Sequence, residues 1–90
     1  MTNSIELLDW FSTRISGGTD YMIAKTTGIT KQTISKVRTG KNELSDNNMM
    51  LLLVVGNHPE PVKTLMKLKA CIAEKQGNDK MAKIWGEYVA

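Results

Sequence analysis

The sequence predicts an all-α protein, a compact bundle of about five helices followed by a C-terminal helix. Apolar residues recur at helical spacing along most of the chain, and Ser or Thr precedes several of these segments, where its hydroxyl can cap a helix start. Glycines follow several of the segments, as they commonly do at helix ends. At 90 residues, the chain is long enough for one domain with a modest core.

Caps and breaks divide the chain into six helical segments. The expected helices, with the expected cap in parentheses where there is one, are residues 4–15 (Ser4), 20–26 (Thr19), 31–39 (Thr30), 46–55 (Ser45), 60–75 and a last short helix from Asn78 or Asp79. The run 49–55 is entirely apolar, and periodicity alone does not separate a buried strand from a buried helix. The cap before this run and Gly56 after it favour a helix.

The segment Asn57-His58-Pro59-Glu60-Pro61 is the clearest break in the chain, because each proline keeps the residue before it out of helical geometry. The break separates a core of residues 1–57 from a C-terminal helical extension of residues 58–90. We expect the extension to pack on the core and to serve in dimerisation.

The segment 20–39 has the spacing of two short helices that meet at a tight turn. Ala24 is small enough to let the second of these helices approach closely, and Gly28 can adopt the positive φ that turns the chain. Ile34 and Val37, three residues apart, are expected to point back into the core. The opposite face of that helix is left polar and basic, which suits base edges and the phosphates beside them.

This pattern resembles the Cro and CI repressor type of helix-turn-helix, also called XRE-like. The matching residues are Ile23-Ala24-x-x-x-Gly28-Ile29-Thr30-x-Gln32-Thr33-Ile34-Ser35-Lys36, then Gly40-Lys41 and the apolar segment from Met49. The likeness covers about residues 4–57. It implies a lambda-repressor-like bundle and a sequence-specific double-stranded DNA-binding regulator, a repressor of phage or mobile-element origin, with helix 31–39 in the major groove.

The resemblance also implies which side chains would meet DNA. The base-contacting residues would be Lys31, Gln32, Thr33 and Lys36. The phosphate-contacting residues would be Thr19, Lys25, Ser35, Arg38, Lys41 and Asn42. Two positions depart from the family pattern: Asp20 stands where the family often has a phosphate-anchoring Gln, and Leu44 is close to the place of a frequent Pro. An acid at position 20 should repel DNA unless it serves only as a first-turn charge.

The distribution of charge supports this interpretation more than its sum does. The formal charge is only +3, but the stretch from Lys25 to Lys41 holds five cations and no acid. The alternative interpretation of these lysines is an ordinary solvated helix face.

One recognition helix reads only a few base pairs, so we expect a homodimer on a two-fold operator. The expected interface residues are Leu68, Ile72, Trp85 and Tyr88, although the two aromatic residues could equally close the chain's own core.

Several classes of function are not indicated. The single cysteine, Cys71, excludes an internal disulfide and a Cys-rich zinc site, and His58, expected to be an exposed loop residue, has no partner at metal-ligand spacing. No base, nucleophile and orienting group occur together, so we expect no enzyme activity, cofactor, metal or small-molecule substrate. The start of the chain lacks signal-peptide regions and the longest apolar run is too short for a membrane, so a cytoplasmic location is expected.

A second hypothesis keeps the same scaffold but gives it a protein partner. In this interpretation the chain is a protein-interaction module, either an antirepressor or a binder of a host protein. Asp20 and the low net charge favour it, whereas the basic helix without acids favours DNA.

Overall fold

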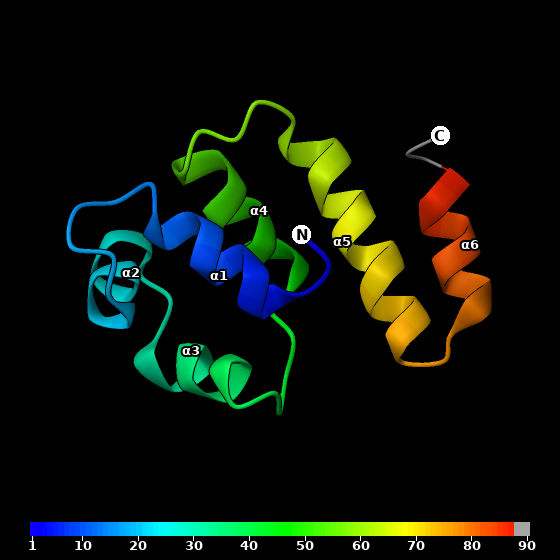
Figure 1. Cartoon of the computed structure of the whole chain (residues 1–90), viewed down its shortest axis with the longest axis horizontal. Helices are drawn as coiled ribbons and strands as arrows, with labels where there is room; N and C mark the ends of the chain where they lie inside the picture. Colours follow the sequence, from blue (N-terminus) through cyan, green and yellow to red (C-terminus); the bar gives the residue numbers. More distant parts are fainter. Residues whose placement is uncertain (88–90) are drawn as a thin grey trace.

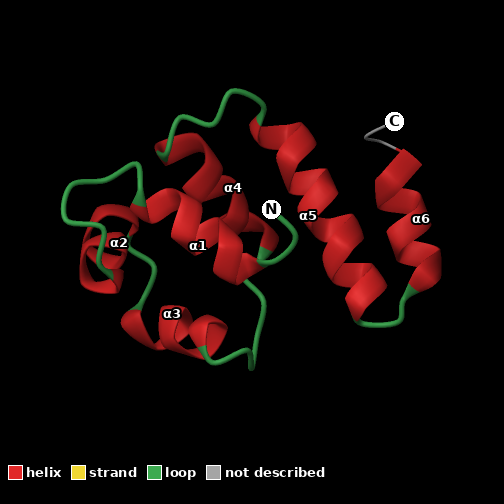
Figure 2. Cartoon of the chain, in the orientation of Figure 1, coloured by secondary structure: helices red, strands yellow, loops and turns green. Residues whose placement is uncertain are grey.

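The structure, a computed structural model, describes residues 1–87, which form six helices (Figures 1 and 2). The helices are α1 (Ser4–Ser12), α2 (Asp20–Thr27), α3 (Lys31–Arg38), α4 (Asp46–Val55), α5 (Pro61–Lys75) and α6 (Asp79–Glu87). Residues 1–87 contain no strand, which confirms the predicted all-α class and decides the run 49–55 in favour of a helix.

Side-chain caps confirm four of the predicted helix starts. The hydroxyl groups of Thr19, Thr30 and Ser45 each accept a hydrogen bond of 3.2 Å from the backbone N–H three residues later. The Asn78 side chain accepts the corresponding bond at the start of α6, also at 3.2 Å. Helix α5 begins at Pro61 without a side-chain cap, and proline suits this first position because its fixed φ matches the helix and its missing N–H would have no partner there.

The prediction that Ser4 caps the first helix is wrong. Asn3 takes that place, and its side-chain oxygen accepts a hydrogen bond from the Glu6 N–H at 2.8 Å. Ser4 is buried instead, where its hydroxyl accepts from the Leu44 N–H at 2.8 Å and its own N–H donates to the Glu43 carboxylate at 2.9 Å. Ser4 therefore anchors the loop that follows α3 to the start of α1.

Helix α1 also ends at Ser12, before the predicted limit at Ile15. The hydroxyl groups of Ser12 and Thr13 donate to the carbonyl oxygens of Asp9 and Trp10, both at 2.6 Å. Such local side-chain bonds offer the backbone an alternative to further helical bonds.

The core lies between α1, α4 and α5 and extends under α2 and α3. Its buried side chains are Leu7, Leu8, Phe11, Ile23, Ile29, Ile34, Val37, Leu44, Met49, Leu52, Leu53, Leu68 and Ile72. The ring of Trp10 lies directly against the backbone of Gly56, so closely that a Cβ on Gly56 would be 2.6 Å from the ring. This contact requires glycine at the end of α4.

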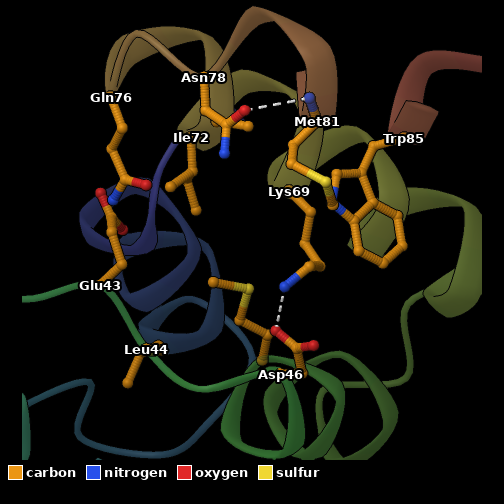
Figure 3. A pocket seen from close by; sticks show the side chains of 11 residues that line it. Glu43, Leu44, Asp46, Lys69, Ile72, Gln76, Asn78, Met81 and Trp85 are labelled. Atoms are coloured by element: carbon orange, nitrogen blue, oxygen red, sulfur yellow. Dashed lines mark hydrogen bonds and ion pairs between the residues drawn. The ribbon is translucent and has the colours of Figure 1, made fainter. Parts of the chain in front are cut away.

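Helix α6 runs beside α5, on the side away from α1 and α3 (Figure 1). A pocket of about 280 Å³ opens where these two helices meet the loop before α4 (Figure 3). Across it the Lys69 ammonium pairs with the Asp46 carboxylate and lies 4.9 Å from the centre of the Trp85 ring. Lys69 thus connects α4, α5 and α6.

In the part of the chain that the structure describes, none of the helices combines the length and apolar character needed to cross a bilayer.

Candidate nucleic-acid interface

The turn between α2 and α3 is three residues long and well defined. Gly28 ends α2 with φ +80°, as predicted, and its N–H donates to the Ala24 carbonyl at 2.8 Å. The hydroxyl of Thr27 donates to the Ile23 carbonyl at 2.7 Å and accepts from the Ile29 N–H at 3.1 Å. Because Ile29 is buried in the core, the turn fixes the position of α3 against α2.

Helix α3 has one buried side and one exposed side. Ile34 and Val37 are each only 1% exposed, as predicted, and they hold the helix on the core. The exposed side carries Lys31, Gln32, Ser35 and Lys36, which we call the polar face of α3. These residues are at positions i, i+1, i+4 and i+5, so they form one stripe along the helix.

Thr33 lies at the edge of this face. Its side chain is half-buried, and its hydroxyl is 2.8 Å from the Thr30 hydroxyl that caps the helix. A base contact by Thr33 would therefore use its methyl group.

The loop after α3 carries two further residues that were predicted to contact DNA. The chain turns at Gly40, with φ +79°, and the N–H groups of Lys41 and Asn42 donate back to the Lys36 carbonyl at 3.0 and 3.4 Å. The side chains of Lys41 and Asn42 are exposed, as is that of Lys25 on α2. These three residues and the polar face of α3 belong to consecutive elements of the chain.

The Arg38 side chain is bound within the protein. Its guanidinium contacts the carboxylate of Asp9 on α1 and also that of Asp20 on α2, with Nη2 3.1 Å from Oδ1 of Asp20. Burial on its own lowers the pKa of Arg38, but the hydrogen bonds to Asp9 and then Asp20 outweigh it and raise the pKa above its ordinary value. We call these three residues the Arg38 cluster.

This cluster gives Arg38 and Asp20 partners within the protein. Arg38, predicted to contact phosphate, directs its donors at two carboxylates and so anchors α3 to α1 and α2. Asp20, which stands where repressors of the Cro and CI type often have a phosphate-binding Gln, is paired with Arg38 and lies in the first turn of α2. Thr19, predicted to contact phosphate, is exposed, and its hydroxyl accepts from the Met22 N–H as the cap of α2, which leaves the O–H hydrogen free to donate.

Tyr21 is a candidate residue that the sequence reasoning missed. It is the second residue of α2, its side chain is 56% exposed, and the Lys31 ammonium lies 4.6 Å from the centre of its ring. Its position off the buried side of α2, in a chain with only five aromatic residues, is the signal that could have identified it.

Two of the four residues expected at the dimer interface are buried inside the chain. Leu68 is fully buried and Ile72 is 9% exposed, both in the chain's own core, so neither has area to offer a second subunit. Both side chains belong to the hydrophobic core cluster of the chain. Trp85 is half-buried on the α5–α6 hairpin, and Tyr88 lies outside the described residues.

His58 and Cys71 are both half-buried. His58 is half-buried rather than exposed, because its ring packs on Trp10 at 5.2 Å and its Nδ1 accepts from the Glu60 N–H at 3.1 Å. Cys71 is a half-buried free thiol. Residues 1–87 contain no group of three His, Cys, Asp or Glu side chains that could hold a metal ion.

Comparison with known proteins gives one relative over the whole length. The chain is 52% identical over 90 residues to a phage protein, "Uncharacterized protein Gp-c" of Pseudoalteromonas phage PM2, and the match covers 100% of this chain and 98% of the relative. No protein-family model matches the chain, and no solved structure matches it. The similarity thus includes α5 and α6 as well as the segment with the helix-turn-helix pattern.

Proposed function

This chain belongs to the family of Gp-c from phage PM2, and we propose that it is a sequence-specific double-stranded DNA-binding regulator of the lambda-repressor-like helix-turn-helix kind. In this proposal, α3 enters the major groove and the protein acts as a repressor. The relative's phage origin agrees with the proposed origin of the chain.

The observation that carries the proposal is the arrangement of α3. An α-helix with its side chains is about 10–12 Å across, and the major groove of B-DNA is about 12 Å wide. Helix α3 is held on the core by Ile34 and Val37 while its polar face, with two lysines and one glutamine, is exposed. The first turn of α3 contains no acidic residue. The helix therefore presents positive charge and amide groups outward, as groove binding requires.

The side chains of the polar face suggest specific base contacts. Gln32 could pair bidentately with adenine, Lys31 or Lys36 could donate to guanine, and the Thr33 methyl group could touch thymine. Each good contact would contribute about 1 to 3 kcal/mol of discrimination between bases.

Phosphate contacts would set the register of the protein on the duplex. We assign them to Lys25, Lys41 and Asn42, which are exposed on α2 and on the loop after α3, and to Ser35 and Thr19. Arg38 would act indirectly, because its bonds to α1 and α2 hold the third helix in place.

A dimer on a two-fold operator is part of the proposal. Half-sites would lie about 34 Å apart, one turn of the double helix. The longest extent of the chain is 38 Å, so two copies side by side can reach that spacing. We assign the dimer contact to α5 and α6, where Val62 (52% exposed) and Ile84 (38% exposed) are available, in place of the buried Leu68 and Ile72.

Selection of bound sequences from a random duplex pool tests the proposal. The full chain should enrich a two-fold consensus, and gel-shift titration should give weaker binding to random duplex with a strong dependence on salt. Binding without enrichment would contradict sequence specificity. Negligible binding to any duplex at low salt would contradict the DNA-binding function altogether.

A protein-interaction module remains the second candidate, and the Arg38 cluster favours it. Because Asp9 and Asp20 neutralise Arg38, the stretch from Lys25 to Lys41 has four free cations instead of five. Absence of duplex binding at low salt, together with capture of a single phage or host protein, would support this candidate over DNA binding.

A further inference from the structure

We propose that Tyr21 is a positioning residue of the DNA interface, whose ring holds the Lys31 ammonium in place for its contact in the groove. This inference rests on the proposed function, and it adds a residue from outside α3 to the side chains that read DNA. The inference also predicts that the Lys31 side chain is already oriented in the free protein, before DNA binds.

The contact between the two residues has the geometry of a cation–π interaction. The Lys31 ammonium is 4.6 Å from the ring centre of Tyr21, within the range of about 6 Å over which a ring attracts a cation. Tyr21 is in the first turn of α2 and Lys31 is the first residue of α3. The capped turn between the helices fixes their backbones, so the ring and the lysine stem are brought together by rigid elements.

Tyr21 is not explained by the packing of the core. Its side chain is 56% exposed, whereas Ile23 on the same helix is fully buried. A large aromatic side chain that remains exposed at the start of α2, beside the polar face of α3, is typical of a residue used in binding.

Lys31 is also a residue that benefits from being held. It occupies the positive end of the α3 dipole, where a cation is disfavoured and where the first turn has no acid to compensate. A lysine side chain is flexible, and ordering it only on binding reduces affinity. The Tyr21 ring restricts the side chain in the free protein, so less freedom is lost when DNA binds.

The variants Tyr21→Leu and Tyr21→Phe distinguish the effect of the aromatic ring from the effect of side-chain size. On the selected operator, Tyr21→Leu should weaken binding about 2- to 5-fold, the effect expected of an exposed cation–π pair, and should reduce the base preference at the position that Lys31 contacts. Tyr21→Phe keeps the ring and should bind as the unchanged protein does. Far-UV circular dichroism and thermal unfolding of both variants should stay unchanged, because the side chain is largely exposed.

A double-mutant comparison tests whether Tyr21 acts through Lys31. In the Lys31→Ala background, Tyr21→Leu should cause no further loss of operator binding. In the matched Lys36→Ala background, which removes another lysine of the same polar face, Tyr21→Leu should still cause its full loss. Equal losses in the two backgrounds would overturn the proposal.

Nuclear magnetic resonance of the free protein tests the contact without DNA. The protons on Cε of Lys31 should be shifted upfield by the ring current, and the shift should disappear in Tyr21→Leu but persist in Tyr21→Phe. Lack of this shift would overturn the proposal even if DNA binding is confirmed. If the unchanged protein binds no duplex at low salt, the proposed function itself fails; if it binds and Tyr21→Leu binds equally well, only the role of Tyr21 fails.

Discussion

Arg38 on α3 and Asp20 on α2 are joined by an ion pair of 3.1 Å between Nη2 and Oδ1, and the same guanidinium reaches Asp9 on α1. One side chain thereby connects the three helices that surround the proposed interface. The cluster orients α3, and its single cation offsets only part of the negative charge of two acids close to the surface assigned to DNA.

Replacing Arg38 with Ala should destabilise the fold, because it leaves two carboxylates without a cation. The pair is partly exposed, so the expected loss is only about 1 kcal/mol in the free energy of unfolding at low salt, and less at high salt. Urea unfolding at two salt concentrations measures both values. The control is Lys63→Ala, which removes a weak exposed pair with Glu60 at 3.9 Å and should change stability very little. Equal effects of the two variants would contradict the anchoring role of Arg38.

Asp20→Asn should have opposite effects on folding and on DNA binding. It removes one partner of Arg38 and a favourable first-turn charge, so stability should fall slightly. It also removes a negative charge beside the proposed interface, so affinity for duplex DNA should rise several-fold at low salt. Asp79→Asn is the matched control, because it makes the same change of charge at the first residue of α6 and should leave affinity nearly unchanged. Unchanged or weaker binding by Asp20→Asn would show that Asp20 does not oppose DNA.

Glycines at three helix positions should respond differently to alanine. Gly28→Ala should cost about 1 to 2 kcal/mol because of its φ of +80°, although a Cβ there meets no atom within 4 Å. Gly56→Ala has an ordinary φ, but its Cβ would overlap the Trp10 ring, so a loss of about 1 to 3 kcal/mol is expected from overpacking. Gly86→Ala in α6 meets neither problem and should be neutral or stabilising by up to about 1 kcal/mol. Denaturant unfolding of the three variants checks this order, and a destabilised Gly86→Ala would contradict it.

Local features of the sequence were sufficient to predict most of the helices. Caps such as Thr30 and turn glycines such as Gly28 act within about four residues, so their partners can be located from spacing alone. Contacts between distant residues were not predicted: Ser4 and Leu44 are 40 residues apart, and Asp9 and Arg38 are 29 apart. No local pattern indicates such pairs.

The same limit applies to the candidate interfaces. The alternation that places Ile34 inside and Lys36 outside is contained in α3 itself, so the exposed face could be predicted. An apolar stripe such as that of α5, in contrast, indicates only that Leu68 is buried. It does not indicate whether the covering surface belongs to the same chain or to a second subunit.

Lys41→Ala should reduce the salt dependence of DNA binding. A lysine that contacts one phosphate releases about one counterion, so the slope of log affinity against log salt should become shallower by about one unit. The loss should be similar on operator and random duplex, because phosphates carry no sequence information. Lys80→Ala, at an exposed position of α6 away from α3, is the control and should leave the slope unchanged. If both variants change the slope equally, the loop after α3 has no special role.

Gln32→Ala should instead reduce specificity while leaving general affinity in place. Gln32 is exposed on the polar face of α3 and is uncharged, so its loss removes base contacts and no counterion release. Binding to the selected operator should weaken by about 1 to 3 kcal/mol, with relaxed preference at one base pair of each half-site. Affinity for random duplex and the salt slope should match those of the unchanged protein. A repeated selection with the variant, read alongside gel-shift titration, measures all three quantities. An equal loss of affinity for operator and for random duplex would refute a base-reading role for Gln32. Such a result would favour a role of Gln32 in maintaining the structure of α3.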